Sequence, residues 1–144
     1  MTKVGIIGTG MLGEAVGLHL LNSNHTVTVF NRTKDKTEKL VDAGATLAES
    51  PKEVAENSDL VITVVRDADA VSEVAFGENG IISGKHDGMV VADMSTINPN
   101  SAKEISQKFE SSGVEFLEIP VMGGPNVAID GKLVMMVSGK KEIF

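Results

Sequence analysis

The chain has 144 residues, of which 42% are hydrophobic and 23% charged, a length and composition typical of one globular domain. Thirteen Lys and Arg residues against twenty Asp and Glu give a net charge of −7, which argues against a nucleic-acid backbone or an anionic membrane as partner. There is no cysteine, so disulfides, thiolate metal ligands and cysteine catalysis are excluded. No run approaches the roughly 18 apolar residues of a transmembrane helix. The first residues enter a strand pattern without the regions of a signal peptide, so we expect a soluble, cytoplasmic protein.

Short apolar runs alternate with segments of helical periodicity along the whole chain. Seven apolar or β-branched runs predict strands, at residues 3–7, 26–30, 45–47, 60–65, 89–92, 114–119 and 133–137. Helical patterns cover residues 11–21, 34–43 and 67–75, begin again at Ser50 and at Asn98, and return at residues 140–144. This βαβ alternation predicts an α/β fold of the Rossmann type, with a doubly wound, mostly parallel sheet covered by helices on both faces. Because the last strand lacks a covering helix, we expect residues 1–144 to be one domain from a longer protein.

Several positions carry local signals that predict caps, turns or core packing. The sequence Ser50–Glu53 combines a hydroxyl cap, a proline at the first helical position and the glutamate of a capping box. Asp67 is expected to cap the next helix. Asp93 ends a buried strand and is expected to bond to backbone in the following turn. Met135 and Met136 are expected to fill the core from the last strand.

The first candidate site is a G-x-G-x-x-G sequence between the first strand and the first helix. It consists of Gly8, Thr9, Gly10, Met11, Leu12 and Gly13. In such a motif the first glycine permits a tight turn, the second lets a pyrophosphate approach the backbone, and the third lets the helix pack against the strand. Unpaired N–H groups at the helix start then bind the anion. The motif predicts a dinucleotide-binding loop, and the alternative is a glycine-rich turn that binds nothing.

The second candidate site follows the second strand. Asn31 lies 23 residues beyond Gly8, where folds that prefer NAD place a carboxylate against the ribose 2′-hydroxyl. Here Asn31, Arg32 and Thr33 offer an amide, a guanidinium and a hydroxyl, which suit a 2′-phosphate. The residues therefore favour NADP over NAD. In the alternative interpretation Arg32 is a solvated loop residue and Thr33 caps the next helix.

The histidines show no pattern of a metal site. His19 falls in a helix, His25 at a strand entry and His86 in a polar turn, and none has a second ligand at metal spacing. We therefore expect no metal.

Four motifs in the same order resemble the β-hydroxyacid dehydrogenase family. They are Gly8–Gly13 with Met11, Asn31-Arg32-Thr33, Asp93-Met94-Ser95-Thr96, and Ile119-Pro120-Val121-Met122-Gly123-Gly124. Over essentially all 144 residues the chain resembles the amino-terminal half of a 3-hydroxyisobutyrate dehydrogenase-like enzyme. The Asn-Arg-Thr sequence is similar to that of the NADP-preferring members, such as glyoxylate and succinic semialdehyde reductases.

The resemblance implies roles for further residues. Val65 and Arg66 would run along the cofactor and Thr96 would lie near the nicotinamide, although Arg66 is also compatible with a solvated loop residue. The residues implied to hold the substrate carboxylate are Ser95, Met122, Gly123 and Gly124.

Two departures from the family pattern stand out. Met122 replaces the usual serine, which removes one hydroxyl donor, although the N–H groups of Gly123 and Gly124 could still bind an anion. The catalytic lysine of the family, and its helical second domain, lie beyond the last residue here. Lys140 and Lys141 come too early in the chain to serve as general acid.

The resulting prediction is the NADP-binding domain of an oxidoreductase, inactive alone, that transfers a hydride between nicotinamide and a small β-hydroxy acid or related aldehyde or keto acid. A homodimer through the helical domain is implied for the complete protein. The rival hypothesis is a non-catalytic NADP-binding sensor or assembly module, since a fold does not determine a function.

Overall fold

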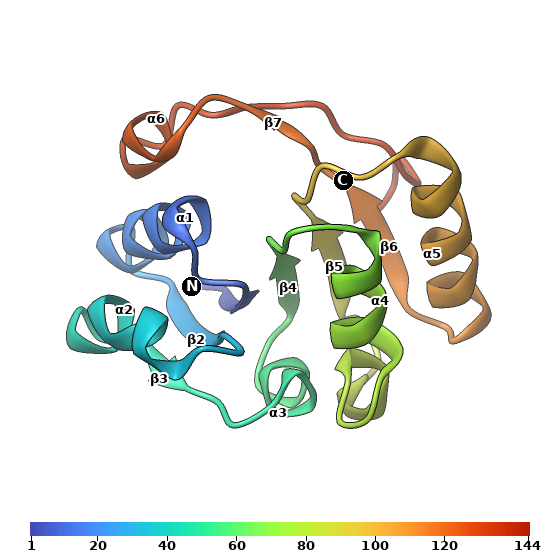
Figure 1. The fold of residues 1–144 in the computed structure, drawn as a ribbon, viewed down its shortest axis with the longest axis horizontal. Helices are drawn as coiled ribbons and strands as arrows, with labels where there is room; N and C mark the ends of the chain where they lie inside the picture. Colours follow the sequence, from blue (N-terminus) through green and yellow to red (C-terminus); the bar gives the residue numbers. More distant parts are fainter.

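Six parallel strands form the central sheet of the computed structural model, which describes all residues 1–144. The strands are β1 (Lys3–Ile7), β2 (Thr26–Phe30), β3 (Thr46–Leu47), β4 (Leu60–Thr63), β5 (Val90–Asp93) and β6 (Glu115–Glu118). Their spatial order is β3-β2-β1-β4-β5-β6, so the chain moves outward from β1 to β3 and then in the opposite direction from β4 to β6 (Figure 1). This is the order of the doubly wound Rossmann fold, which confirms the predicted fold class.

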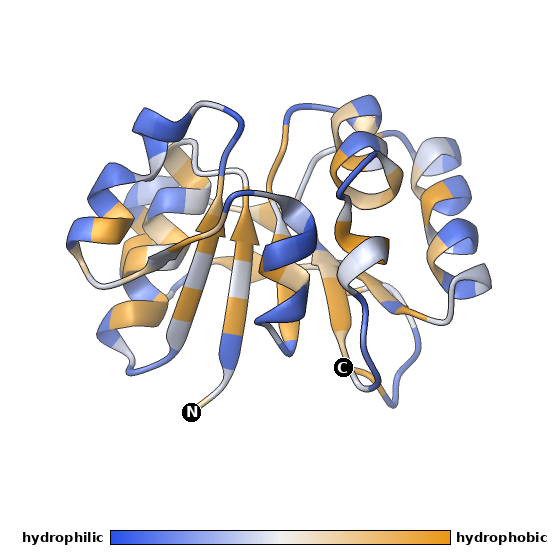
Figure 2. Ribbon diagram, turned by 90° about the horizontal axis from the view of Figure 1, so that it is seen from below, coloured by the Kyte–Doolittle hydropathy of each residue, from blue (hydrophilic) through white to orange (hydrophobic).

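Helices cover both faces of the sheet (Figure 1). They are α1 (Met11–Asn22), α2 (Glu38–Asp42), α3 (Pro51–Glu56), α4 (Ala68–Phe76), α5 (Pro99–Ser111) and α6 (Pro125–Ile129), with short 3₁₀ turns η1 (Lys34–Thr37) and η2 (Ile81–Gly84). One buried cluster joins the strands to α1, α2 and α6 around Ile6 and Leu40, and the other joins them to α3, α4 and α5 around Val61 and Phe109. Hydrophobic residues accordingly run along the strands (Figure 2). None of the helices has the length and apolar character needed to cross a membrane.

The predicted caps of α3 and α4 are confirmed. Ser50 Oγ accepts a hydrogen bond from the Glu53 N–H at 3.2 Å, and Asp67 Oδ1 accepts one from the Ala70 N–H at 2.9 Å. The Glu53 carboxylate accepts from the N–H of Glu49 at 2.6 Å, whereas a regular capping box would use the N–H of Ser50. The box therefore closes one residue earlier than predicted, on the loop that connects β3 to α3.

Two predicted elements differ in the structure, one because it is divided and one because it is shorter. The helix predicted at residues 34–43 is divided into η1 and α2. The strand predicted at residues 60–65 ends at Thr63, and the residues after it form a loop beside β1. That shortening matters for function, because residues 64–66 are free to line a pocket.

The strand predicted at residues 133–137 is confirmed in part, but the core position expected for Met135 and Met136 is wrong. Residues 133–137 do not extend the parallel sheet, because β7 (Val121–Met122) and β8 (Val134–Met135) pair antiparallel as a separate ribbon. Met135 and Met136 are 51% and 55% exposed, so they do not fill the core. The physical reason is the connection between the two strands. A parallel pair needs a long crossover, whereas the intervening helix α6 is short and packs on α1 with Ala128 buried.

Residues 140–144 also differ from their prediction. They form a turn, in which the Ile143 N–H donates to the Lys140 carbonyl at 3.0 Å, and these five residues form no helix. A single bond of this kind fixes one turn but does not propagate a helix.

Candidate functional site

The glycine-rich loop between β1 and α1 lies close to the backbone after β4 and to the first turn of α1. Gly8 has φ +100°, and a Cβ at this position would collide with the Val64 carbonyl oxygen. A Cβ on Gly13 would collide with the Gly8 carbonyl oxygen. The start of α1 can therefore lie this close to the loop only because residue 13 is a glycine. Gly10 differs, because a Cβ there would meet nothing within 4 Å. It is the N-cap of α1 and has no side-chain cap, which leaves the first N–H groups of the helix open to an anion.

Asn31 connects this loop to the end of β2. Its Oδ1 accepts a hydrogen bond from the Thr9 N–H at 2.9 Å, and its Nδ2 donates to the Thr33 carbonyl at 2.9 Å. The Gly8 N–H donates to the Phe30 carbonyl at 3.0 Å beside it. Asn31 therefore braces the glycine loop, a role that sequence reasoning missed because its partner Thr9 is 22 residues away.

A pocket of about 570 Å³ opens at the carboxyl ends of β1, β2 and β4. Of the residues predicted to bind a cofactor, it is lined by Gly8, Gly10, Asn31, Arg32, Thr33, Val65 and Arg66. It lies at the switch point between β1 and β4, which is where open α/β sheets bind their ligands. Sequence positions from three separate loops thus meet in one cavity.

The structure adds charged residues to this pocket that sequence reasoning did not include. Lys36, in η1, lines it together with Arg32, and Asp69 and Glu73 line it from α4. Lys36 follows Thr33 by three residues, and residues three apart in a helical turn lie on the same side. The helical pattern of this segment could therefore have placed Lys36 beside Thr33 at the pocket.

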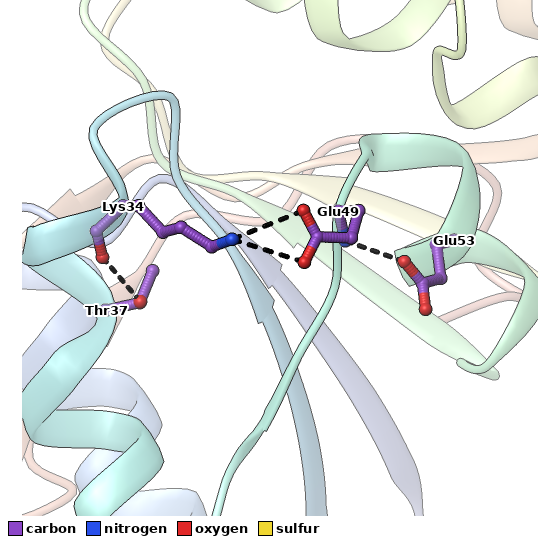
Figure 3. Close-up of polar contacts among 4 residues, drawn as sticks. All are labelled: Lys34, Thr37, Glu49 and Glu53. Atoms are coloured by element: carbon purple, nitrogen blue, oxygen red, sulfur yellow. Dashed lines mark hydrogen bonds and ion pairs between the residues drawn. The ribbon is translucent and has the colours of Figure 1, made fainter.

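The cations near the end of β2 differ in their partners. Lys34 binds the Glu49 carboxylate at 3.3 Å, as Figure 3 shows. Arg32 and Lys36 are exposed and form no ion pair. Arg66 contacts Asp67 through Nε at 3.1 Å, and the Ala70 N–H together with Arg66 lowers the pKa of the Asp67 carboxyl. The two cations available to an anionic ligand at the β2 end are therefore Arg32 and Lys36.

Ser95 lies behind the wall of the pocket. It is buried, and its Oγ accepts a hydrogen bond from the Val65 N–H at 2.9 Å. Asp93 Oδ1 accepts from the Ser95 N–H at 3.1 Å, which confirms that Asp93 bonds to backbone in the turn after its strand. Burial raises the pKa of Asp93, although hydrogen bonds from Thr63 and Ser95 oppose this shift.

The remaining predicted residues do not line the pocket. Thr96 is exposed in the turn after β5, and Met122, at the end of β7, is 62% exposed. Gly123 and Gly124 follow Met122 at the start of α6. Among the glycine-loop residues outside the lining, Thr9 is buried with an unpartnered hydroxyl, and Met11 is exposed. The loop therefore lines the pocket mainly with its backbone.

The histidines contact backbone atoms. His19 Nδ1 lies 3.1 Å from the Ile129 carbonyl, and His86 Nε2 lies 2.8 Å from the Ser58 carbonyl. No three His, Cys, Asp or Glu side chains are close enough together to hold a metal ion.

Comparison with known protein families decides the assignment. Residues 3–144 match the family described as the NAD binding domain of 6-phosphogluconate dehydrogenase. The chain belongs to this family. The glycine loop, the end of β2 and residues 64–66 are therefore parts of an NAD-binding domain, and they line one pocket of it.

Individual relatives of this NAD-binding domain are oxidoreductases. YkwC of Bacillus subtilis strain 168, named an uncharacterized oxidoreductase, is 38% identical over 141 residues, which are 98% of this chain and 49% of YkwC. The 3-hydroxyisobutyrate dehydrogenase of Mycobacterium tuberculosis, solved with L-serine, is 25% identical with a TM-score of 0.92 over 99% of this chain and 48% of that protein. The predicted resemblance to this group of dehydrogenases is confirmed. The chain spans about half the length of these relatives.

Solved structures similar to this domain hold either form of the cofactor. An imine reductase of Myxococcus stipitatus in complex with NADP⁺ is 27% identical, with a TM-score of 0.81 over 87% of this chain and 43% of that protein. A variant of it in complex with NAD⁺ shares the fold, with a TM-score of 0.92 over 100% of this chain and 49% of the variant at 23% identity. The family description and the NADP⁺ complex both concern binding of a pyridine nucleotide.

Proposed function

We propose that this chain is the NADP-binding domain of an oxidoreductase that transfers a hydride between nicotinamide and a small β-hydroxy acid or the related aldehyde or keto acid. The observation that carries the choice of NADP is the end of β2, where Arg32 and Lys36 line the pocket without ion-pair partners. No carboxylate stands at position 31, so nothing there would repel a 2′-phosphate. The two carboxylates of the pocket, Asp69 and Glu73, come from α4.

The backbone of the glycine loop fits a pyrophosphate. Gly10 leaves open space at the start of α1, and the uncapped N–H groups of this helix supply donors and the positive end of its dipole. Asn31 holds the loop in place from the side of β2. In this proposal Arg32 and Lys36 then bind the 2′-phosphate, and Arg66 lies along the cofactor.

The bound cofactor supplies or accepts the hydride, and the reaction also needs a proton carrier at the substrate hydroxyl. In this proposal the chain itself does not supply that carrier. Lys36 is the single lysine of the pocket, and we assign it to the phosphate. Lys140 binds Glu115 at 3.2 Å, which raises its pKa, whereas acid–base catalysis requires a lowered one. We therefore assign the proton carrier to a part of the enzyme beyond residue 144.

The substrate side is assigned from the resemblance to β-hydroxyacid dehydrogenases. Thr96 is proposed near the nicotinamide, and Met122, Gly123 and Gly124 near the substrate carboxylate. The similarity to a 3-hydroxyisobutyrate dehydrogenase solved with L-serine, itself a small β-hydroxy acid, supports this class of substrate.

A titration with both reduced nucleotides tests the cofactor assignment. We expect the chain to bind NADPH more tightly than NADH, and expect Arg32→Ala and Lys36→Ala each to weaken NADPH binding by about tenfold, the value of one charge-assisted hydrogen bond. Neither substitution should change the affinity for NADH, which lacks the 2′-phosphate. Nucleotide fluorescence gives both dissociation constants.

Lys34→Ala is the matched control, because it removes a neighbouring positive charge that is bound to Glu49. It should leave the preference for NADPH nearly unchanged. Tighter binding of NADH by the unmodified chain, or an equal effect of all three substitutions, would overturn the assignment.

A further inference from the structure

Two buried polar residues connect the carboxyl ends of β4 and β5 directly behind the nucleotide pocket. In the parallel register of these strands Thr63 lies opposite Asp93. Asp93 is 2% exposed, and its Oδ1 accepts hydrogen bonds from the Thr63 hydroxyl at 2.7 Å and from the Ser95 N–H at 3.1 Å. This carboxylate therefore holds the turn after β5 against the end of β4.

Ser95 extends this connection to the wall of the pocket. Its Oγ accepts a hydrogen bond from the Val65 N–H at 2.9 Å, and Val65 lines the pocket. On the other side of the same loop the Val64 N–H donates to the Ile7 carbonyl at 2.9 Å. The Val64 carbonyl oxygen lies so close to Gly8 that a Cβ at Gly8 would collide with it. Residues 64–66 are thus held between the glycine loop and Ser95.

The Val65 N–H has no alternative partner in the sheet, because β4 ends at Thr63. Without the Ser95 hydroxyl this donor would lose its acceptor in a partly buried place, which costs free energy and favours movement of the loop. A shift of the loop would change the pocket wall next to Gly8, where the backbones already touch.

We infer that Ser95, held by Asp93, is a positioning residue of the nucleotide site: its hydroxyl fixes the Val65 N–H and with it the wall formed by residues 64–66. This inference rests on the proposed nucleotide binding in the pocket. It gives Ser95 a role different from the substrate contact implied by the family resemblance, because the hydroxyl is engaged on the side of the cofactor loop.

The test compares two substitutions of Ser95 with a control. Ser95→Ala removes the acceptor of the Val65 N–H, and Ser95→Thr keeps a hydroxyl. Ser58→Ala is the matched control, because Ser58 is also a buried serine and donates to the Val54 carbonyl, but it lies at the opposite end of β4. The measurements are the hydrogen exchange rate of the Val65 amide in the free protein and the dissociation constant for NADPH.

We expect Ser95→Ala to accelerate exchange of the Val65 amide and to weaken NADPH binding by about fivefold, as for the loss of one hydrogen bond of average strength. Ser95→Thr should restore most of the protection and the affinity, and Ser58→Ala should change neither. Unchanged exchange at Val65 in Ser95→Ala would overturn the inference, as would an equal loss of affinity in Ser58→Ala.

The exchange measurement also separates this inference from the proposed function. If the unmodified chain binds neither NADPH nor NADH, the proposed function fails and the nucleotide part of the inference fails with it. The Val65 exchange rate still decides whether Ser95 positions the loop, since that measurement needs no ligand.

Discussion

Asp93 keeps a carboxylate inside the protein, and the free energy this costs depends on pH. Burial raises its pKa above the usual 3.8, against the opposing hydrogen bonds of Thr63 and Ser95. The folded protein therefore binds this proton more tightly than the unfolded chain. Consequently the contribution of Asp93 to the free energy of unfolding decreases as the pH rises from below 3.8 through the folded-state pKa.

Asp93→Asn should remove this pH dependence. We expect the free energy of unfolding of the variant, relative to the unmodified protein, to increase as the pH rises from about 3.5 to about 6. Burial and the neighbouring Asp93 charge also raise the pKa of Glu118, so removing that charge acts in the same direction. Urea unfolding of both proteins at several pH values measures the difference. A difference that stays constant over this range would contradict the prediction.

The junction of β1 and α1 separates two uses of glycine within one motif. Gly13 has no room for a side chain, because a Cβ would meet the Gly8 carbonyl, whereas Gly10 has open space around its Cα. Gly13 is therefore needed for folding, and we propose that Gly10 is needed for the approach of a ligand.

Gly13→Ala should destabilise the protein by about 1–3 kcal/mol, as expected for an overpacked contact between backbones. Gly10→Ala should change the free energy of unfolding by less than about 1 kcal/mol but should strongly weaken NADPH binding, because its Cβ would stand where the pyrophosphate approaches. Chemical unfolding and a nucleotide titration of both variants distinguish the two effects. Equal losses of stability in the two variants would argue against this division of roles.

The ribbon of β7 and β8 is a different kind of element from the strands of the sheet. Its side chains Met122, Val134 and Met135 are exposed. Phe109 on α5, in contrast, is completely buried between Phe76 and Phe116, with ring centroids 4.8 Å from each. Apolar residues occur in the sequence at both places, but the methionines of the ribbon stay at the surface whereas Phe109 lies in the core.

Met136→Ala should therefore change the free energy of unfolding by less than about 0.5 kcal/mol, and Phe109→Ala should lower it by about 3–5 kcal/mol. Urea unfolding gives both values. A loss of several kcal/mol in Met136→Ala would mean that the ribbon is buried in solution, contrary to its exposure in this structure.

At the scale of the whole molecule, the pocket proposed for the nucleotide and the residues proposed for the substrate are separate. The pocket lies at the switch point of the sheet, whereas Met122, Gly123 and Gly124 lie on the ribbon and at the start of α6. The chain spans about half the length of YkwC and of the 3-hydroxyisobutyrate dehydrogenase, and we propose that the enzyme needs more than these residues.

We expect residues 1–144 alone to bind NADPH and yet to show no steady turnover with NADP⁺ and a small β-hydroxy acid such as L-serine. The reason is that Lys36, the single lysine of the pocket, is assigned to the 2′-phosphate, and the proton carrier to another part of the enzyme. The absorbance of NADPH followed over time measures this. Turnover at a rate typical of dehydrogenases would show that the chain contains its own proton carrier.

Much of this domain follows from local sequence. The strands, the helix starts at Ser50 and Asp67, and the glycine loop were predictable because each depends on residues within a few positions of one another. The sequence did not predict that Lys36 lines the pocket, although it follows Thr33 closely. Its position there depends on which side of η1 is turned toward the pocket. The exposed ribbon was missed because an apolar run predicts a strand but not the sheet it joins.

The amino-acid sequence by itself determined the order of strands and helices from β1 to β6, the glycine loop between β1 and α1, and the charge at the end of β2, because these are properties of short segments. Only the tertiary structure decided that Asn31 braces Thr9, that Ser95 holds Val65 and that Met136 is exposed. Each of these depends on partners brought together by the parallel sheet, 22 residues apart for Asn31 and 30 for Ser95, or on the absence of a partner at the ribbon. Pairing across such separations is set by the packing of whole elements, which no local pattern of residues specifies.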